Sequence, residues 1–395
     1  MACTATRAWA IATACLAGAT LASGASFTTY VDMPFNGSVG FQPQTPLVQG
    51  ADGNFYGTMP NDYGQGCGSV YRLTPTGVSS LVHSFTRSAG DACHPQAALV
   101  TGPQGSLWGT TQYGGSHGSG TIYKIDARGQ FSLVHSLEGF SDQPVAPLLF
   151  ARDGNFYGTT WHGGVQGWGS VFRISPDGVF VELASFTASG PHQPTAGLVQ
   201  TPDGNLWGTL SNGGPLTSAC AFGCGGVFRL TPEGSLTTFM PFDGTTALDP
   251  VDSLTVGSDG LLYGVTPFCG YGSSCAGAAF RLDLQGRFTV LHEFTRTESP
   301  GAYPSGPLIQ TADGYFYGET RSSSSTPADD SAGTVFRMTH RGAVAVVHYF
   351  ALDTGTSRAS WPLGGLVADR RARMLHGVTF QGGIGNNGAA FSLSR

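Results

Sequence analysis

The sequence predicts an all-β protein, a seven-bladed β-propeller with four antiparallel strands in each blade, and three observations lead to this fold class. A glycine-centred motif recurs seven times at intervals of about 50 residues, and Asp153–Thr160 (DGNFYGTT) is its clearest copy. Each of the first six repeats holds four short runs that are rich in β-branched and aromatic residues and are bounded by Gly, Pro and Asp. No segment shows a helical period over a useful length. Four antiparallel strands repeated seven times are typical of a propeller.

The other copies of the motif share its closing glycine. They are Asp52–Thr58, Gln104–Thr110, Asp203–Thr209, Asp259–Val265, Asp313–Glu319 and the more diverged Ala372–Val378. A glycine inside a strand costs about 0.5–1 kcal/mol, so a glycine in all seven copies needs a reason. We expect that reason to be the close approach of the neighbouring blade.

The third repeat shows the four runs, which we call a, b, c and d. We expect run a at 144–149, run b at 155–160, run c at 169–174 and run d at 179–186. Run b is entered through Asp153-Gly154, a dipeptide that supplies the positive φ of a tight hairpin turn.

The two ends of the chain complete each other. The last repeat (361–395) has runs a, b and c but no run d, whereas Phe27–Phe35 resembles the run d at Thr237–Phe242. We therefore expect 27–35 to complete blade 7, with Thr28–Phe35 pairing with Gly388–Leu393, so that 27–395 forms one propeller domain. Closing the ring removes the exposed edges of an open array.

The start of the chain has the layout of a secretory signal peptide. Arg7 precedes the apolar run Ala8–Leu21, and small residues follow up to Ala25, so we expect residues 1–25 to be cleaved. A lipoprotein site at Cys15 is the alternative. The apolar run is too short to span a bilayer, and no other long apolar segment exists. The prediction is an exported protein that is extracellular, at the cell surface or periplasmic, with no membrane span.

Composition narrows the possible partners. The net charge is −6, only 11% of the residues are charged, and the 19 Lys and Arg are scattered. Nucleic acid is therefore not expected as a partner, and we expect a monomer.

Cleavage would leave six cysteines, and an even number in an exported chain predicts disulfides. Cys67 and Cys93 should reach the same face of the ring, so we pair them. Proximity pairs Cys220 with Cys224 and Cys269 with Cys275, but these two neighbouring loops could exchange partners.

Two sets of repeated polar residues have a structural and a functional interpretation. A basic residue follows the aromatic of run c in six blades: Arg72, Lys124, Arg173, Arg229, Arg281 and Arg337. Run d carries His83, His135, His292 and His348. The first set could bind anions and the second a metal. Because equivalent positions are spread around the ring, we expect a hydrogen-bonding ladder within each blade and a structural role for the histidines.

Several motifs occur together in each copy: DGNFYGTT, a Gly-Gly loop, GSVFRISPDG at 169–178 and Leu-Val-His-Ser-Phe at 81–85, or their equivalents. In this combination the chain resembles the GloVer tandem repeat of exported bacterial "choice-of-anchor" proteins, over 27–395. The resemblance implies an exported repeat protein of uncharacterised function, often with a C-terminal sorting tail. This chain ends without such a tail, so this part of the resemblance does not extend to surface anchoring here. Asp203–Gly208 also resembles, less closely, sensor-type and streptogramin-lyase propellers.

The candidate binding residues lie just before a repeated proline. Every repeat contains Pro-x-x-x-Leu, and proline suits the first residue of a strand, so the residue before it should lie near the mouth of the central channel. These seven residues are Gln42, His94, Gln143, Gln193, Asp249, Tyr303 and Trp361. A structural ring is one interpretation. The other is a ligand mouth, with Asp249, Tyr303 and Trp361 as its specific side and Trp161 and Trp168 reaching in.

The loops between runs b and c also carry aromatic residues, which suit sugar rings or peptide side chains: Tyr63, Tyr113, Trp161, Trp168, Phe268 and Tyr271. They could instead cover the sheet ends.

No nucleophile elbow, zinc motif or phosphate loop is present, so we predict no catalytic residues, cofactor or metal. The Asp-Gly-Asn turns could bind calcium, but turn formation explains them. Two hypotheses remain: a non-catalytic module that binds an extracellular glycan, peptide or cell-surface protein, or a lyase or hydrolase with its active site in the channel. A polar, acid-containing channel would favour the enzyme.

Overall fold

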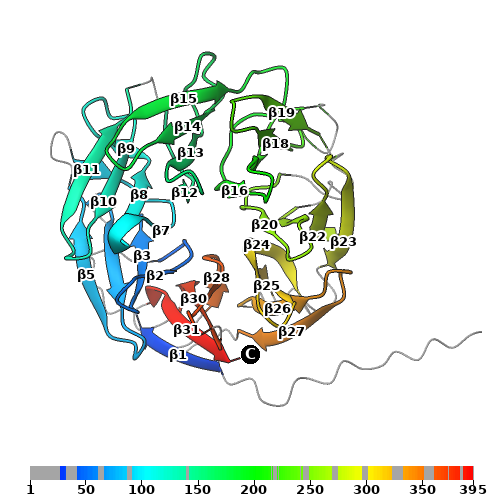
Figure 1. Ribbon diagram of the computed structural model, residues 1–395. Coiled ribbons are helices and arrows are strands. Elements are labelled where there is room, and N and C mark those ends of the chain that lie inside the picture. The colour runs from blue at the N-terminus through cyan, green and yellow to red at the C-terminus, as the bar shows by residue number, and fades with distance from the viewer. Residues whose placement is uncertain are drawn as a thin grey trace, which may run out of the picture.

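The computed structural model confirms a seven-bladed propeller, and its strands surround a central axis (Figure 1). It describes residues 27–32 (of 29–32 the backbone), 42–60, 66–86, 91–138, 142–214, 216, 220, 222–240, 242, 249–268, 275–295, 301–322, 332–350, 360–371, 373–382 and 386–394. The predicted signal peptide lies outside these residues. Helical structure within them is limited to short 3-10 turns, of which η1 (Pro103–Gly105) is described in full.

Each blade is an antiparallel sheet whose strands a to d run from the centre outward. Blade 1 is β2 (Val48–Gln49), β3 (Phe55–Met59), β4 (Ser69–Leu73) and β5 (Ser79–Ser84); blade 2 is β7 (Val100–Thr101), β8 (Leu107–Thr111), β10 (Thr121–Ile125) and β11 (Phe131–Ser136); blade 3 is β12 (Leu149–Phe150), β13 (Phe156–Thr160), β14 (Ser170–Ile174) and β15 (Phe180–Ser185); blade 4 is β16 (Val199–Gln200), β17 (Leu206–Leu210), β18 (Gly226–Leu230) and β19 (Leu236–Phe239).

The remaining strands complete the ring. Blade 5 is β20 (Thr255–Val256), β21 (Leu262–Thr266), β22 (Cys275–Leu282) and β23 (Phe288–Thr295); blade 6 is β24 (Ala302–Gln310), β25 (Phe316–Ser322), β26 (Thr334–Met338) and β27 (Val344–Tyr349); blade 7 is β28 (Ser360–Pro362) with β29 (Val367–Ala368), then β30 (Met374–Gln381), β31 (Ala389–Ser394) and β1 (Phe27–Asp32); a separate pair is β6 (Ala92–Cys93) with β9 (Tyr113–Gly114).

The N-terminal strand closes the ring as predicted. Strand β1 pairs antiparallel with β31, from Phe27 opposite Leu393 to Asp32 opposite Ala389, and supplies the missing strand d of blade 7 (Figure 1). Residues 33–35, the end of the predicted pairing, lie outside the described part of the chain.

The strand-b glycines have a different cause from the one predicted. Gly158 pairs with Phe172 on strand c of its own blade, and a Cβ on Gly158 would overlap the tip of that ring. Gly208 meets Phe228 in the same way. The glycine therefore makes room for an aromatic side chain within the same sheet, while the neighbouring blade contributes little to this contact.

Strand a is shorter than predicted. In blade 3 the paired residues are Leu149 and Phe150, and Pro144 and Pro147 lie outside the ladder. In blade 6 the register of β24 breaks between Ser305 and Ile309, around Pro307. The prolines cannot donate an N–H, so in blade 3 run a begins as an irregular segment before the ladder starts, and in blade 6 the ladder is interrupted instead.

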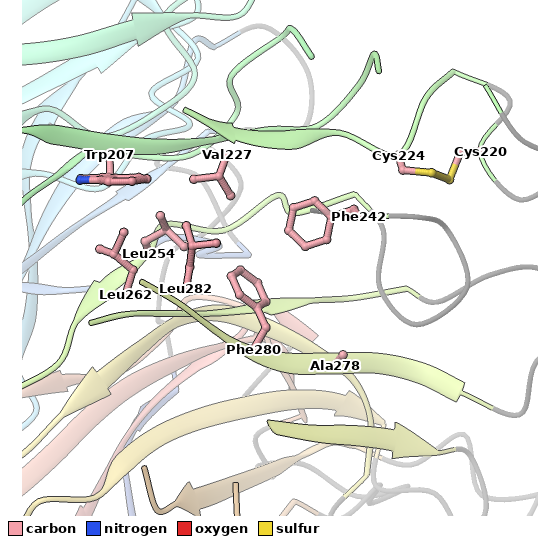
Figure 2. Close-up of a cluster of buried hydrophobic side chains, with 10 residues drawn as sticks. All are labelled: Trp207, Cys220, Cys224, Val227, Phe242, Leu254, Leu262, Ala278, Phe280 and Leu282. Carbon is pink, nitrogen blue, oxygen red and sulfur yellow. A yellow bond between two sulfur atoms is a disulfide. The ribbon is translucent and has the colours of Figure 1, made fainter. Parts of the chain in front are cut away.

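The core lies between blades as well as within them. In the cluster of Figure 2, Trp207 and Val227 of blade 4 pack with Leu254, Phe280 and Leu282 of blade 5, and all five are buried. Removing apolar surface from water contributes about 25 cal/mol per Å², and this is the main force that holds the neighbouring blades together. The cluster of blades 3 and 4 is built in the same way, so each pair of neighbouring blades is held together by its own buried cluster.

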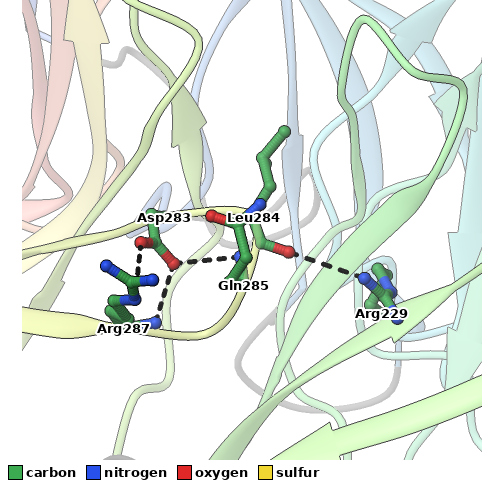
Figure 3. A network of polar contacts seen from close by, with 5 residues as sticks. All are labelled: Arg229, Asp283, Leu284, Gln285 and Arg287. Atoms are coloured by element: carbon green, nitrogen blue, oxygen red, sulfur yellow. Dashed lines mark hydrogen bonds and ion pairs between the residues drawn. The ribbon is translucent and has the colours of Figure 1, made fainter.

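The repeated basic residues make structural contacts, but not the uniform ladder that we predict. Arg72 donates to Ser80 Oγ in its own blade (3.1 Å). Arg229, however, donates to the Leu284 carbonyl of blade 5 (3.5 Å; Figure 3). Arg229 also lies 5.8 Å from the Trp207 ring centroid. Cation–π packing and contacts between blades therefore replace part of the expected hydrogen bonding.

Candidate functional site

The seven residues before the repeated proline share an unusual backbone. All have a left-handed φ: Gln42 (62°), His94 (59°), Gln143 (48°), Gln193 (59°), Asp249 (57°), Tyr303 (58°) and Trp361 (55°). A positive φ is uncommon outside glycine and is worst for β-branched side chains. None of the seven is β-branched, and this is the sequence signal of the conformation.

This backbone joins two loops. The N–H of Gln143 donates to the carbonyl of Ser119 in blade 2 (3.0 Å), and its carbonyl accepts from the N–H of Trp161 in its own blade (3.0 Å). Gln193 repeats this arrangement with Trp168 and Ser211. The seven residues therefore lie at the end of the propeller that carries the b–c loops, which we call the loop face.

The proline that follows packs against the preceding blade. Pro144 lies where a Cβ on Gly120 would be, and Pro194 lies in the same way on Gly169. Both glycines have a positive φ, of 104° and 99°. The backbone of the residue before each proline is thus part of a structural joint between two blades. The type of side chain at this position can vary from blade to blade.

The side chains on blades 2 to 4 form an arc of amides. Gln112 Nε2 donates to Gln143 Oε1 of the next blade (3.2 Å) and accepts at Oε1 from Gln96 (2.7 Å). Asn212 Nδ2 donates to Gln193 Oε1 (2.7 Å). Amides both donate and accept hydrogen bonds, so this arc can donate hydrogen bonds to hydroxyl groups of a ligand and accept hydrogen bonds from them.

Aromatic contacts predominate on blades 5 to 7. Tyr303 packs edge-on to Phe268 with ring centroids 6.1 Å apart, and Trp361 stacks with Phe380 at 6.4 Å. Trp361 remains 38% exposed. His94 of blade 2 contacts Tyr113 edge-on at 5.5 Å. The seven residues therefore differ from one side of the ring to the other.

The two tryptophans of blade 3 are half-buried. Trp161 follows strand b and contacts Gln143 through its backbone, and its indole Nε1 is buried with no hydrogen-bond partner among the described residues. Trp168 packs edge-on against His192 of the following connection (4.4 Å). Trp168 also packs against the buried cluster between blades 3 and 4.

Other loop aromatics are exposed. Tyr113 (40% exposed) and Phe268 (42%) lie on b–c loops, as expected, while Tyr63 and Tyr271 lie outside the described residues. Phe222, which the sequence analysis did not single out, is 80% exposed. Its carbonyl accepts from the N–H of Gly213 (2.8 Å). This backbone bond ties the turn that presents the Phe222 ring to solvent.

Disulfides brace the same face. Cys67–Cys93 and Cys220–Cys224 are bonded as predicted. Cys275 is also disulfide-bonded, and Cys269, its predicted partner, lies outside the described residues. The Cys220–Cys224 bridge encloses Phe222, so the most exposed loop aromatic among the described residues sits on a constrained turn.

Acidic residues near the inner strands of blades 5 and 6 escaped sequence reasoning, apart from Asp249. Burial raises the pKa of Asp249 to about 6. Burial also raises the pKa of Asp252 to about 6, while the Arg321 guanidinium and the Gly306 backbone act to lower it. Burial raises the pKa of Glu319 to about 8, and the nearby Asp252 adds to the effect. The sequence signal that could have identified Asp252 is its position in the repeat, where blades 2 to 4 have alanine.

The Asp-Gly-Asn carboxylates are engaged by their own turns. Asp153 accepts from the Asn155 backbone N–H (3.1 Å), the Asn155 side chain (2.8 Å) and the Tyr157 hydroxyl (2.8 Å). Asp52 makes the same three contacts. Nowhere in the described ranges do three or more His, Cys, Asp or Glu side chains group as metal ligands would. No helix in those ranges is long and apolar enough to cross a membrane.

The fold and the repeated joints define a closed tandem-repeat propeller. The model of the Gloeobacter/Verrucomicrobia repeat matches residues 42–266 and 143–391, and the chain belongs to this family. This confirms the resemblance seen in the sequence. No curated protein matches the chain.

Several solved structures share the fold. One is the extracellular domain of a B. thetaiotaomicron protein described as a hybrid two-component system, with 13% identity over 92% of this chain and a TM-score of 0.58. Another is the extracellular domain of a one-component system of that organism, with 13% identity over 93% and a TM-score of 0.56. The chain spans 40% and 42% of those two proteins. A third, from Bacteroides uniformis, is described as a 6-phosphogluconolactonase, with 16% identity, coverage of 82% and 88%, and a TM-score of 0.51.

Proposed function

We propose that the protein is an exported, non-catalytic binding module whose loop face takes a carbohydrate at the mouth of the central channel. The observation that carries this proposal is the asymmetric set of seven pre-proline residues. A repeated backbone joint holds all seven in one conformation, while their side chains change from amides on blades 3 and 4 to Asp249, Tyr303 and Trp361 on blades 5 to 7. Binding residues typically lie on loops held by a rigid scaffold.

The chemistry of the mouth suits a sugar. An aromatic ring offers a flat apolar surface for the C–H face of a pyranose, and Trp361 is partly exposed next to Phe380. Amide and carboxyl groups supply the donors and acceptors that fix hydroxyl groups. We place Gln143, Gln193 and Asp249 in that second role.

Two further features support export and binding. The disulfides belong to an oxidising compartment, and two of the proteins with the same fold are extracellular domains. The loop face also carries Phe222 and Phe268 as exposed aromatics. A protein ligand that covers these rings is the competing partner.

A second candidate function is an enzyme that acts in the channel. The raised pKa values of Asp249 and Asp252, both about 6, favour it, because general acids have pKa values near the working pH. One protein of the same fold is described as a 6-phosphogluconolactonase. Release of product from a carbohydrate or lactone panel by the wild-type protein, lost in Asp252→Asn, would replace our proposal with this one.

The binding proposal is tested with a glycan array, followed by calorimetry on the best glycan. The double variant Tyr303→Ala/Trp361→Ala should bind at least tenfold more weakly, a loss of about 1.4 kcal/mol or more, with an unchanged melting temperature. Tyr349→Ala is the matched control, because Tyr349 is an exposed aromatic (51%) on the outer strand β27. Full affinity in the double variant, or binding to peptide arrays alone, would show that the proposal is wrong.

A further inference from the structure

Glu319 occupies a repeat position that carries a hydroxyl in four other blades. The equivalents are Thr58, Thr110, Thr159 and Thr209, each directly after the strand-b glycine. Thr58 Oγ1 donates to the Ala97 carbonyl of the next blade (3.1 Å), and Thr110 Oγ1 donates to that of Ala146 (3.2 Å). In blade 6 the polarity is reversed, because Glu319 Oε2 accepts from the backbone N–H of Gly365 in blade 7 (2.9 Å).

The Glu319 carboxyl is enclosed between the two blades. The residue is 1% exposed. Its second oxygen, Oε1, lies against Gly377 of blade 7 and has no hydrogen-bond partner among the described residues. Gly306 of blade 6 and Gly365 of blade 7 also meet here, since a Cβ on Gly306 would come within 2.7 Å of the Gly365 Cα. We call these contacts the 6–7 seam.

Few groups at the 6–7 seam would stabilise a negative charge on the Glu319 carboxyl. The carboxylate of Asp252 in blade 5 interacts electrostatically with Glu319, and that of Asp249 interacts with Asp252. Arg321, on the same strand as Glu319, acts on Asp252. His376, next to Gly377, packs on Phe55 of blade 1 (4.3 Å) and so faces away. Burial and Asp252 raise the pKa of Glu319 to about 8, although the Gly365 N–H acts to lower it. The neutral carboxyl is therefore the form that fits.

The same seam positions the proposed ligand mouth. Ser305 Oγ donates to the Pro362 carbonyl (3.0 Å), and these residues follow Tyr303 and Trp361 closely in sequence. The Trp361 N–H donates to the Ala332 carbonyl of blade 6 (2.9 Å). A change in the packing of blades 6 and 7 would therefore change the distance between Tyr303 and Trp361.

We propose that the 6–7 seam is a proton-controlled joint, which is closed while Glu319 is protonated and loosens, displacing Tyr303 and Trp361, when the carboxyl loses its proton. An ionised carboxylate with one N–H partner and a carboxylate neighbour is costly to bury. Admitting water between the blades relieves that cost. The effect on ligand binding rests on the proposed function, whereas the effect on the seam does not.

The seam itself is tested by thermal unfolding between pH 6.5 and 8.5. Because the folded pKa of Glu319 lies above the unfolded value, its stabilising contribution is lost as pH rises toward about 8. The wild-type melting temperature should therefore fall across this range. Glu319→Gln and Glu319→Thr should flatten the curve, while Glu233→Gln, which removes an exposed carboxylate, should leave it unchanged.

Two further measurements, hydrogen exchange and carboxyl NMR, test the seam independently of the melting temperature. Hydrogen exchange of residues 360–371, expressed as protection relative to the free peptide, should fall above pH 8 in the wild type but not in Glu319→Gln. If neither variant folds, 13C-carboxyl NMR of the wild-type glutamates replaces them. One carboxyl that titrates above pH 7 supports the joint. All glutamates titrating below pH 6, or an unchanged pH slope in Glu319→Thr, would overturn it.

A glycan that binds at the loop face supplies the second arm. Its affinity should fall at least threefold from pH 6.5 to 8.5 in the wild type and stay constant in Glu319→Gln. A pH-dependent seam with constant glycan affinity would retain the joint and reject its link to the mouth. Absence of any glycan ligand would count against the proposed function and leave the seam result intact.

Discussion

The imidazole of His348 stacks on the ring of Phe27, with centroids 3.6 Å apart and planes inclined by 5°. His348 lies on the outer strand of blade 6, and Phe27 begins the strand that completes blade 7. Other blades repeat this contact: His83 stacks on Phe131 (3.9 Å, 5°) and His135 on Phe180 (4.5 Å, 6°). Three of the four run-d histidines thus have the structural role that we predict for them, while His292 packs edge-on against Phe294 of its own strand. At the closure the contact between His348 and Phe27 holds the N-terminal strand.

Replacing Phe27 with alanine should destabilise the ring. The ring of Phe27 also contacts Phe350 and Phe391, at 5.6 and 5.5 Å between centroids. Because Phe27 is partly buried, we expect a loss of about 2 kcal/mol, measured by urea denaturation. Thr28→Ala, at an exposed neighbour, should change stability by less than about 0.5 kcal/mol. Equal losses in the two variants would contradict the role of the stack.

Deleting residues 1–36 is the stronger form of the same prediction. Strand β31 would lose its partner β1 and become an open edge. The melting temperature should fall sharply, and the truncated protein should aggregate on heating. Calorimetry that shows an unchanged transition would refute the closure.

Acid should weaken the closure through His348. Burial lowers the pKa of His348 to about 4, so between pH 6.5 and about 4 the unfolded chain binds more protons than the folded one. Stability therefore falls as pH decreases through this window. His348→Phe keeps a flat ring and should lose less stability between pH 7 and 4.5 than the wild type, as measured by melting temperature. His117→Phe, at an exposed site, should behave like the wild type.

A methyl group on Gly158 should overpack blade 3. A Cβ there would overlap the tip of the Phe172 ring, and the backbone of Gly158 is not left-handed, so the effect is steric. We expect Gly158→Ala to cost about 1–3 kcal/mol. Adding Phe172→Leu should recover part of the loss, because it removes the ring. If the double variant lost more free energy of unfolding than the two single variants together, this explanation would be contradicted.

The two disulfides should differ in their effect on stability. Cys67–Cys93 spans 26 residues and Cys220–Cys224 spans 4. Loop-closure entropy predicts a loss of about 3.5 kcal/mol when the first is replaced by serines and about 2 kcal/mol for the second. Denaturation of the two double variants checks the order. Non-reducing peptide mapping tests the remaining pair, Cys269–Cys275, and recovery of Cys269 in any other linkage would show that this pairing is wrong.

Much of the architecture could be read from local patterns. The Asp153-Gly154 turn carries its own geometry, since Gly154 has a φ of 80° and Asp153 binds the N–H two residues on. Repetition of such turns sets the number of blades. The orphan strand at Phe27 and the incomplete last repeat set the closure. These features depend on residues that are close in sequence, or on the number of repeats and of runs in each repeat.

Burial and charge depended on the ring itself. Glu319 reads in the sequence as one substitution in a repeat, yet its neighbours Asp252 and Gly365 lie 67 and 46 residues away along the chain. Desolvation by both blades raises its pKa, and no local pattern contains that information. The exposure of Phe222, the aromatic ring over Gly158 and the left-handed backbone before each proline have the same origin. Each depends on which surfaces the closed ring brings into contact, and only tertiary packing decides that.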